Sequence, residues 1–293
     1  MKGRHIDVST TRRTTRRTPR ITTRRATLAA LAALPLTAAL ASPASAATAR
    51  HDRRTLFIAG DSTAAQKYLD AKPETGWGMA LPLFLSDRVR VANHAVNGRS
   101  SKSFVDEGRL DTILAAIRPG DLLLIQFAHN DEKSADPTRY TEPWSTYQEH
   151  LKLYVDGARA KGARPVLATA VERRKFDASG NSLPTHGDYP AAMRALAEQE
   201  GVALLDIQAL SLALWQKLGV DETQTYFNWT ATEQDNTHFN PPGAIAVARL
   251  VATELLDRKV LAHRDVRRVG DEIDELDPAW QSRLSWLAGT TPA

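Results

Sequence analysis

Five short apolar segments recur between residues 54 and 210, and stretches of helical character separate them. The clearest segment, Asp121–Phe127, reads Asp-Leu-Leu-Leu-Ile-Gln-Phe. An apolar run this short is typical of a strand that is buried on both faces of a parallel sheet. Because parallel strands need crossover connections, the sequence predicts an α/β domain with helices on both faces of one five-stranded parallel sheet. The strands are expected at Leu56–Ala59, Val89–Ala95, Asp121–Phe127, Pro165–Ala170 and Val202–Ile207.

The helices are expected over residues 78–86, 103–117, 144–161, 188–200 and 242–259. Two connections, 173–187 and 219–240, are long, and loops of that length in compact domains commonly carry function. After residue 262 four apolar side chains recur at roughly helical spacing, which favours a helical tail that packs on the domain. A chain of 293 residues can bury a substantial core. We expect residues 47–293 to form one monomeric domain. The apolar residues of the tail are Trp280, Leu284, Trp286 and Leu287.

Residues 1–46 have the organisation of an export signal. An Arg-rich region precedes the uncharged run Ala26–Ala41, and Ala44-Ser45-Ala46 has the small side chains of a cleavage site. The run is short and rich in Ala and Thr, which argues against a membrane span. We therefore expect cleavage near Ala46/Ala47 and a mature protein that is secreted. Arg24-Arg25 resembles a twin-arginine motif, but other Arg pairs precede it, so the twin-arginine and general routes both stay open.

The formal charge of +4 has its origin in this segment. Residues 1–46 hold nine Lys and Arg and one acid, whereas the remaining residues hold 29 basic and 33 acidic side chains, a formal charge of −4. The remainder has no basic stripe, so neither nucleic acid nor a membrane is an expected partner, although a basic nucleic-acid-binding arm is the alternative reading of the amino terminus. Cysteine is absent, so the core must hold the domain without disulfides.

The first predicted strand ends at Gly60-Asp61-Ser62. In open α/β sheets ligands bind outside the carboxyl ends of the strands, so the Ser62 hydroxyl is expected in the reactive zone. Gly, Asp and Ser are also common in turns and helix caps, which is the structural alternative.

Asp235 precedes His238 by three residues in one of the long connections, which we expect to be a constrained loop. An acid at that spacing can accept the imidazole Nδ1–H and leave Nε2 facing a hydroxyl, as acyl transfer to Ser62 requires. Gly98 follows the second strand, where a glycine allows close approach of a backbone N–H. Asn130 follows the third strand and can donate to a developing oxyanion. Both positions are also ordinary turn positions.

A metal site is a competing interpretation, because His129, Asp131, Asp235 and His238 all follow strands or occupy late loops. No His-Glu-x-x-His or cysteine-based ligand spacing is present, and a metal site would leave Ser62 without a role. We therefore expect neither a metal nor another cofactor.

Together, these segments resemble the sequence blocks of the SGNH (GDSL-type) hydrolase superfamily. The set looks like the rhamnogalacturonan acetylesterase branch and covers about Leu56 to Asp257. The resemblance implies a three-layer, flavodoxin-like α/β/α fold with strand order 2-1-3-4-5, and an esterase that removes acetyl groups from plant cell-wall polysaccharide. The matching blocks are Gly60-Asp61-Ser62-Thr63-Ala64, Gly76-Trp77-Gly78, Gly98-Arg99-Ser100, His129-Asn130-Asp131, Thr185-His186-Gly187-Asp188-Tyr189-Pro190 and Asp235-Asn236-Thr237-His238-Phe239.

By this resemblance Ser62 is the nucleophile, His238 the general base and then acid, and Asp235 its orienting partner. The backbone N–H groups of Ser62 and Gly98 and the side-chain amide of Asn130 would form the oxyanion hole. The family usually has Gly at the position of Ala128, so a positive φ there would strain this chain.

Substrate contacts are expected from four further residues, with core packing or solvated charge as the alternative for each. Arg173 belongs to a cationic set in the 173–187 loop that would suit a galacturonate carboxylate. Three interpretations stay open: an esterase of acetylated rhamnogalacturonan or pectin, a broad acetylxylan or short-chain acyl esterase, and a carbohydrate-binding module without chemistry. The four residues are Trp77, His129, Arg173 and His186.

Overall fold

A parallel sheet forms the centre of the computed structural model, which describes residues 53–290. Its five strands lie in the order β2-β1-β3-β4-β5, and every neighbouring pair is parallel. The expected α/β fold and its 2-1-3-4-5 order are thereby confirmed. The export segment expected at residues 1–46, with its cleavage site, lies outside the described residues. The strands are β1 (Arg54–Gly60), β2 (Val89–Asn93), β3 (Leu122–Gln126), β4 (Arg164–Ala168) and β5 (Ala203–Leu205).

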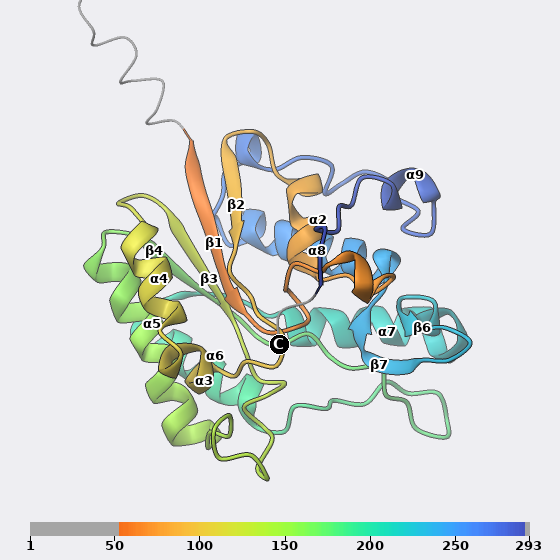
Figure 1. Ribbon diagram of the computed structural model, residues 1–293, viewed down its shortest axis with the longest axis horizontal. Coiled ribbons are helices and arrows are strands. Elements are labelled where there is room, and N and C mark those ends of the chain that lie inside the picture. The colour runs from red at the N-terminus through yellow and green to blue at the C-terminus, as the bar shows by residue number, and fades with distance from the viewer. Residues whose placement is uncertain (1–52, 291–293) are drawn as a thin grey trace, which may run out of the picture. The chain divides into compact units, whose positions relative to one another are not determined.

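Helices cover both faces of the sheet (Figure 1). They are α2 (Trp77–Ala80), α3 (Ser101–Asp106), α4 (Arg109–Ala116), α5 (Gln148–Ala160), α6 (Tyr189–Glu200), α7 (Ile207–Gln224), α8 (Pro241–Asp257) and α9 (Pro278–Gln281). Short 3₁₀ turns span Leu69–Ala71, Leu81–Phe84 and His263–Asp265, and a π turn, Pro143–Tyr147, leads into α5.

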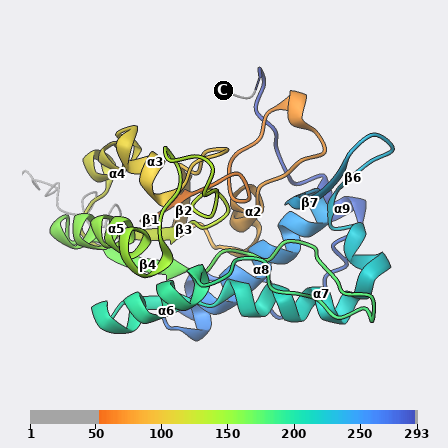
Figure 2. The ribbon, with the colours of Figure 1, turned by 90° about the horizontal axis from the view of Figure 1, so that it is seen from below.

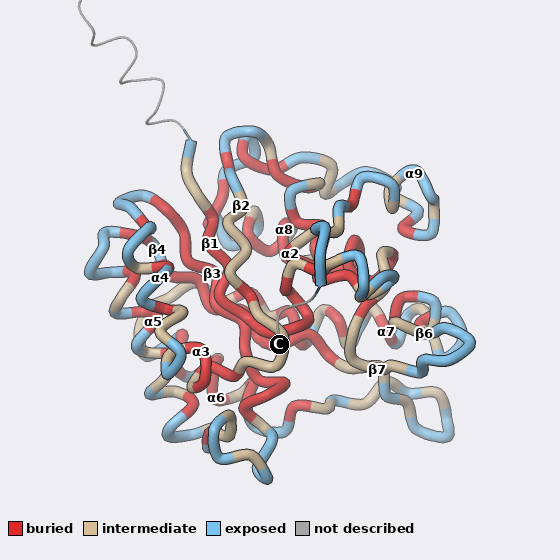
Figure 3. The backbone as a smooth tube through the Cα atoms, in the orientation of Figure 1, coloured by how far each residue is buried: buried red, intermediate tan, exposed pale blue. Residues whose placement is uncertain are grey.

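Alternating side chains of β1 reach opposite layers, because successive residues of a strand point to opposite faces. Leu56 and Ile58 pack in one cluster with residues of α2, α7 and α8. Phe57 and Ala59 pack in a second cluster with residues of α3, α4, α5 and α6. Figure 3 shows the resulting burial, with β1 and β3 at the centre of the buried region. Within residues 53–290, no helix is both long enough and apolar enough to cross a membrane.

Several parts of the chain differ from what the sequence predicts. The helix expected over 103–117 is divided into α3 and α4 by Gly108, whose φ of 69° is left-handed and interrupts the helix. The connection after the fifth strand contains α7, which the sequence analysis did not predict and which kinks at Gly219. The long connection 219–240 is not a loop: it contains β6 (Phe227–Trp229) and β7 (Gln234–Phe239), paired antiparallel.

The carboxyl ends of the parallel strands lie at one edge of the sheet, and Figure 2 looks onto this edge. The β6–β7 hairpin stands beside it, on the side of α7 and α8 (Figures 1 and 2). The chain after α9 returns to the segment that follows β1, where Tyr68 pairs with Leu287. Leu284 is buried in the same cluster as Leu56. In the described part of the tail expected to be helical, up to residue 290, only Pro278–Gln281 is an α-helix.

Candidate active site

Ser62, Asp235 and His238 form one continuous chain of hydrogen bonds. His238 Nε2 lies 2.8 Å from Ser62 Oγ, and His238 Nδ1 lies 2.6 Å from Asp235 Oδ2. Ser62 follows the end of β1, whereas Asp235 and His238 belong to β7. Ser62 and His238 are 176 positions apart in the chain. This is the geometry of a nucleophile, a base and an orienting acid.

A bulge in β7 allows Asp235 and His238 to face each other. In a regular strand, residues three apart point to opposite faces. Here Phe227 pairs with Phe239 and Trp229 with Gln234, so the segment between Gln234 and Phe239 is longer than the segment of β6 that it faces. Asp235 Oδ1 also accepts hydrogen bonds from its own strand, from Thr237 N at 2.6 Å and His238 N at 3.1 Å. The expected constrained loop is therefore a bulged strand, in which the acid fixes the local backbone as well as the imidazole.

Asp235 is a carboxylate at neutral pH. Burial by itself would raise its pKa, but the hydrogen bond and charge of His238, with the two backbone N–H donors, outweigh burial and hold the pKa below its usual value. The ionised acid accepts the Nδ1–H of His238. The imidazole therefore presents its Nε2 lone pair to the Ser62 hydroxyl.

Each of the three N–H groups expected to form the oxyanion hole keeps a hydrogen without a partner among the described residues. Within the described residues, neither the Ser62 nor the Gly98 backbone N–H donates a hydrogen bond. Gly98 has a φ of 73°, in the left-handed region that favours glycine. Asn130 Nδ2 donates to Arg99 O at 3.1 Å, which uses one of the two amide hydrogens and leaves the other.

Asp61 fixes the turn that carries Ser62. Its Oδ1 accepts from Thr63 N at 2.9 Å and from Thr63 Oγ1 at 2.7 Å, and its Oδ2 lies 3.0 Å from His129 Nδ1. Burial would raise the pKa of Asp61, yet His129 and Thr63 lower it to about 2. Burial lowers the pKa of His129 to about 4, against the opposing effect of Asp61. His129 is thus neutral at pH 7 and donates Nδ1–H to Asp61.

Ala128 is not strained. Among the described residues other than glycine, only Lys259 and Arg268 have a positive φ. The strain considered for this departure from the family pattern is therefore absent, and the Ala128 methyl group is buried in the core beside α5 and α6.

The structure does not place the four expected substrate contacts on an open surface. Trp77 is 1% exposed, and its Nε1 donates to Gln126 Oε1 at 2.7 Å, so the ring is part of the core. His129 and His186 are 3% and 1% exposed and lie edge to face beneath the site. Arg173 is partly buried and forms an ion pair with Glu132, which also lies 3.2 Å from His186 Nδ1. For Trp77, His129 and His186, burial contradicts a direct role in contacting substrate, because protein groups already surround them.

Lys67 is a site neighbour that the sequence analysis missed. Its side chain is fully buried, with Nζ 2.6 Å from Glu74 Oε1 and 2.8 Å from Asn97 Oδ1. Burial lowers the pKa of Lys67, and Glu74 opposes that shift. Since Asn97 precedes Gly98, the buried ammonium anchors the loop that presents the Gly98 N–H. No local sequence pattern signals this buried charge, because a lysine is ordinarily exposed unless a partner from elsewhere in the chain pairs with it.

No group of three or more His, Asp or Glu side chains between residues 53 and 290 is arranged to hold a metal ion. His129 and Asp131, considered above as ligands, have other partners. Asp131 accepts from Ser101 N at 3.0 Å, and burial raises the pKa of Asp131 to about 7.

Comparison with known proteins agrees with this geometry. The model of the GDSL-like Lipase/Acylhydrolase family matches residues 58–244, which include every residue of the hydrogen-bonded chain. The chain belongs to this family. As a GDSL-type protein it is a carboxylic ester hydrolase with the SGNH fold, and the matching relatives place it in the rhamnogalacturonan acetylesterase branch.

Two relatives from Bacillus subtilis are similar along most of their length. The rhamnogalacturonan acetylesterase RhgT is 44% identical over 206 residues, which cover 67% of this chain and 87% of RhgT. The probable rhamnogalacturonan acetylesterase YesY is 44% identical over 197 residues, covering 67% of this chain and 90% of YesY. The crystal structure of YxiM, also from Bacillus subtilis, is 31% identical with a TM-score of 0.64; the match covers 72% of this chain and 58% of YxiM.

Proposed function

We propose that this GDSL-type hydrolase is a secreted serine esterase that removes acetyl groups from acetylated rhamnogalacturonan or a related pectin. The observation that supports the mechanism is the hydrogen-bonded chain from Ser62 through His238 to Asp235, beside two unused backbone N–H groups. The names of RhgT and YesY, each 44% identical to this chain, support the substrate class.

His238 begins the reaction as a general base. Its Nε2 takes the proton of Ser62 Oγ while Oγ attacks the acetyl carbonyl carbon, and the carbonyl oxygen becomes an oxyanion. The N–H groups of Ser62, Gly98 and Asn130 stabilise that charge in the transition state. Asp235 keeps the imidazole in the tautomer that accepts at Nε2 and stabilises the imidazolium.

The tetrahedral intermediate then collapses. His238 donates its proton to the sugar oxygen, the C–O bond to the sugar breaks, and the acetyl group stays on Ser62 Oγ. A water molecule, deprotonated by the same Nε2, attacks the acyl-enzyme, and acetate leaves as the proton returns to Ser62. No redox step is involved.

Acetate release by variants of the three residues tests this mechanism. Ser62→Ala and His238→Ala should each lower kcat by several orders of magnitude with an unchanged circular dichroism spectrum, because nucleophile and base act as one unit. Asp235→Asn should lower kcat by a somewhat smaller factor. Ser179→Ala, which alters an exposed serine outside the hydrogen-bonded chain, serves as the control. Near-normal turnover by Ser62→Ala would overturn the mechanism.

The substrate class needs a separate panel. The wild-type enzyme should show a higher kcat/KM on acetylated rhamnogalacturonan than on acetylxylan, and long-chain acyl esters should be poor substrates. Equal rates on pectic and xylan substrates would support the broad acetylxylan or short-chain esterase instead.

We also propose export with cleavage near Ala46/Ala47 and a monomeric mature enzyme, based on the organisation of residues 1–46. Amino-terminal sequencing of protein from the culture medium tests the cleavage position. Recovery of the uncleaved chain in the cytoplasm alone would contradict export. Size-exclusion chromatography with light scattering tests the monomer.

A further inference from the structure

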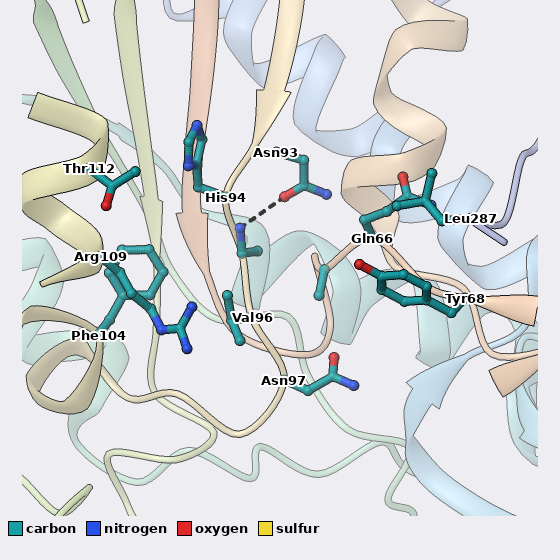
Figure 4. Close-up of a pocket in the computed structure, with 12 residues that line it drawn as sticks. Gln66, Tyr68, Asn93, His94, Val96, Asn97, Phe104, Arg109, Thr112 and Leu287 are labelled. Carbon is teal, nitrogen blue, oxygen red and sulfur yellow. Dashed lines mark hydrogen bonds between the residues drawn. The ribbon is translucent and has the colours of Figure 1, made fainter. Parts of the chain in front are cut away.

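A pocket of about 350 Å³ opens beside the edge strand β2 (Figure 4). Residues that follow the carboxyl ends of β1 and β2 line it. Four separate parts of the chain form its walls: the segment after β1, the strand β2 with the turn that follows it, the α3–α4 region, and Leu287 of the carboxyl-terminal tail. The side chains that line the pocket include Tyr68, His94, Asn97, Arg109 and Leu287.

The pocket adjoins the candidate active site along the backbone. Asn97 lines it, and the next residue is Gly98, whose N–H is one of the groups available to an oxyanion. Ala65, three residues after Ser62, lines it as well. Because the pocket is lined by residues that follow Ser62 and precede Gly98, a sugar next to the acetylated one can reach it from Ser62.

Arg109 is the cation of this pocket. Its guanidinium points toward the turn that carries Val96 and Asn97 (Figure 4). Nε of Arg109 donates to Glu107, and the same carboxylate accepts from Arg99 Nε at 3.1 Å. Two guanidinium groups thus share one carboxylate, which leaves a net positive charge. Within the described residues, the two terminal nitrogens of Arg109 have no hydrogen-bond partner.

The remaining walls suit a sugar ring. Tyr68 is half-buried and directs its hydroxyl into the pocket, opposite Arg109 (Figure 4). Leu287 supplies apolar surface behind it, and Asn97 supplies an amide at the floor. Burial lowers the pKa of His94, so this imidazole is neutral at pH 7 and does not compete as a cation. A mostly apolar wall with a few fixed polar groups is the usual form of a small-ligand site.

In the loop expected to recognise an acidic sugar, both arginines already have protein partners. Arg173 forms an ion pair with Glu132. Arg174 lies 5.0 Å from the centroid of the Trp229 ring and donates to Asn236 and to Val220 O. The terminal nitrogens of both guanidinium groups therefore have protein partners, unlike those of Arg109.

We propose that this pocket is a subsite for a uronic acid residue of the polysaccharide, whose carboxylate pairs with the terminal nitrogens of Arg109. The sugar ring lies against Tyr68, and its hydroxyl groups reach Asn97. This assignment rests on the proposed function, since it names the part of the acetylated polysaccharide that the enzyme recognises beside the scissile ester. A guanidinium binds a carboxylate through two parallel hydrogen bonds, which gives orientation as well as affinity.

Three substrates separate the roles of charge, sugar and acyl group. They are an acetylated rhamnogalacturonan oligosaccharide, the same oligosaccharide with its uronates reduced to neutral sugars, and a small aryl acetate. Arg109→Ala should raise KM for the first about tenfold or more, as expected for a lost charge-assisted pair, and leave kcat nearly unchanged. KM for the reduced oligosaccharide and the rate on the aryl acetate should not change.

Two further variants test whether Arg109→Ala acts only by disturbing the structure. Glu107→Gln removes the carboxylate that competes for Arg109, so KM for the acidic oligosaccharide should fall. Arg118→Ala, an exposed arginine just beyond α4, should alter none of the three reactions. Thermal unfolding of each variant shows whether α4 still folds.

The outcomes distinguish this proposal from the proposed function. Full wild-type activity on the acidic oligosaccharide together with an unchanged KM in Arg109→Ala overturns the subsite alone. An equal rise of KM on the acidic and reduced oligosaccharides also overturns it, because the pocket would then not recognise the carboxylate. A wild-type enzyme that deacetylates xylan but not the acidic oligosaccharide overturns the proposed substrate and the subsite together.

Discussion

Asn130 carries two amide hydrogens, and the folded protein uses one of them. The bond to Arg99 O holds the amide in place, and Arg139 Nη1 lies 3.5 Å from Asn130 Oδ1 on the other side. The second hydrogen is therefore held in a fixed direction before substrate arrives. Fixed donors stabilise charge that develops in the transition state, because they need no reorganisation at that moment.

Asn130→Ala should lower kcat about a hundredfold to a thousandfold and change KM little, the usual effect of losing one oxyanion donor. Asn130→Asp, which keeps the size but loses the N–H donors, should behave similarly. Steady-state kinetics on an acetyl ester measures both. A rise confined to KM would assign Asn130 to ground-state binding instead.

His129 makes stability depend on pH. Burial lowers its pKa from 6.5 to about 4 in the folded protein, so between these values the unfolded chain binds more protons than the folded one. The contribution of His129 to the free energy of unfolding therefore decreases as the pH falls from 6.5 toward 4. Asp131, whose pKa burial raises to about 7 from 3.8, contributes the opposite slope across the whole of this window.

A difference measurement isolates the contribution of His129. The free energy of unfolding of the wild type minus that of His129→Gln should decrease by up to about 3 kcal/mol as the pH falls from 6.5 to 4. Asp131 is present in both proteins, and its contribution cancels. Urea titrations across this range provide the test, and a constant gap would show that His129 keeps its ordinary pKa.

The β6–β7 hairpin is the element on which the proposed chemistry depends, because its bulge turns Asp235 and His238 to one side. Arg174 holds this bulge from outside. Its backbone N–H donates to Asn236 O at 2.8 Å, and its Nη1 donates to Asn236 Oδ1 at 3.1 Å. Arg174 thus acts on the site through the residue between Asp235 and Thr237.

Arg174→Ala should lower kcat about ten- to a hundredfold, since a small displacement of His238 from Ser62 suffices for a loss of that size. KM should change less. Lys175→Ala, at the neighbouring exposed position, is the matched control. If Arg174→Ala instead raised KM on acidic substrates alone, Arg174 would contact substrate rather than position the hairpin.

At the scale of the whole molecule, the carboxyl-terminal tail packs against the segment that follows β1. Leu287 N donates to Lys67 O at 3.0 Å, Leu69 N donates to Leu287 O at 3.0 Å, and Trp286 Nε1 donates to Glu74 O at 2.9 Å. The tail therefore supports the backbone on both sides of the buried Lys67–Glu74 pair. It also supplies one wall of the pocket beside β2.

Leu284→Ala should lower the free energy of unfolding by about 2 to 4 kcal/mol, because Leu284 is buried in the main core cluster. Leu276→Ala, at a position that is 43% exposed in the same tail, should change it by no more than about 0.5 kcal/mol. Denaturant unfolding compares the two. Equal small effects would show that the tail packs without contributing to stability.

The sequence by itself determined the features that depend on local pattern. Short apolar runs predicted the parallel sheet, because a strand buried on both faces needs apolar residues at every position. The position of Ser62 after β1 and the spacing of Asp235 and His238 follow from residue order, and both are readable in the chain. Local pattern did not predict the helix α7 or the β6–β7 hairpin.

Only the tertiary structure decided which polar side chains are free. Trp77, His129 and Arg173 carry chemistry suited to a sugar. Distant parts of the chain, at Gln126, Asp61 and Glu132, bind the Trp77 Nε1, the His129 Nδ1 and the Arg173 guanidinium. The terminal nitrogens of Arg109 stay open, in a pocket that β2 and the tail complete. The physical reason is that a hydrogen bond or ion pair depends on groups within about 3 Å in space, and such groups come from positions that no local pattern connects.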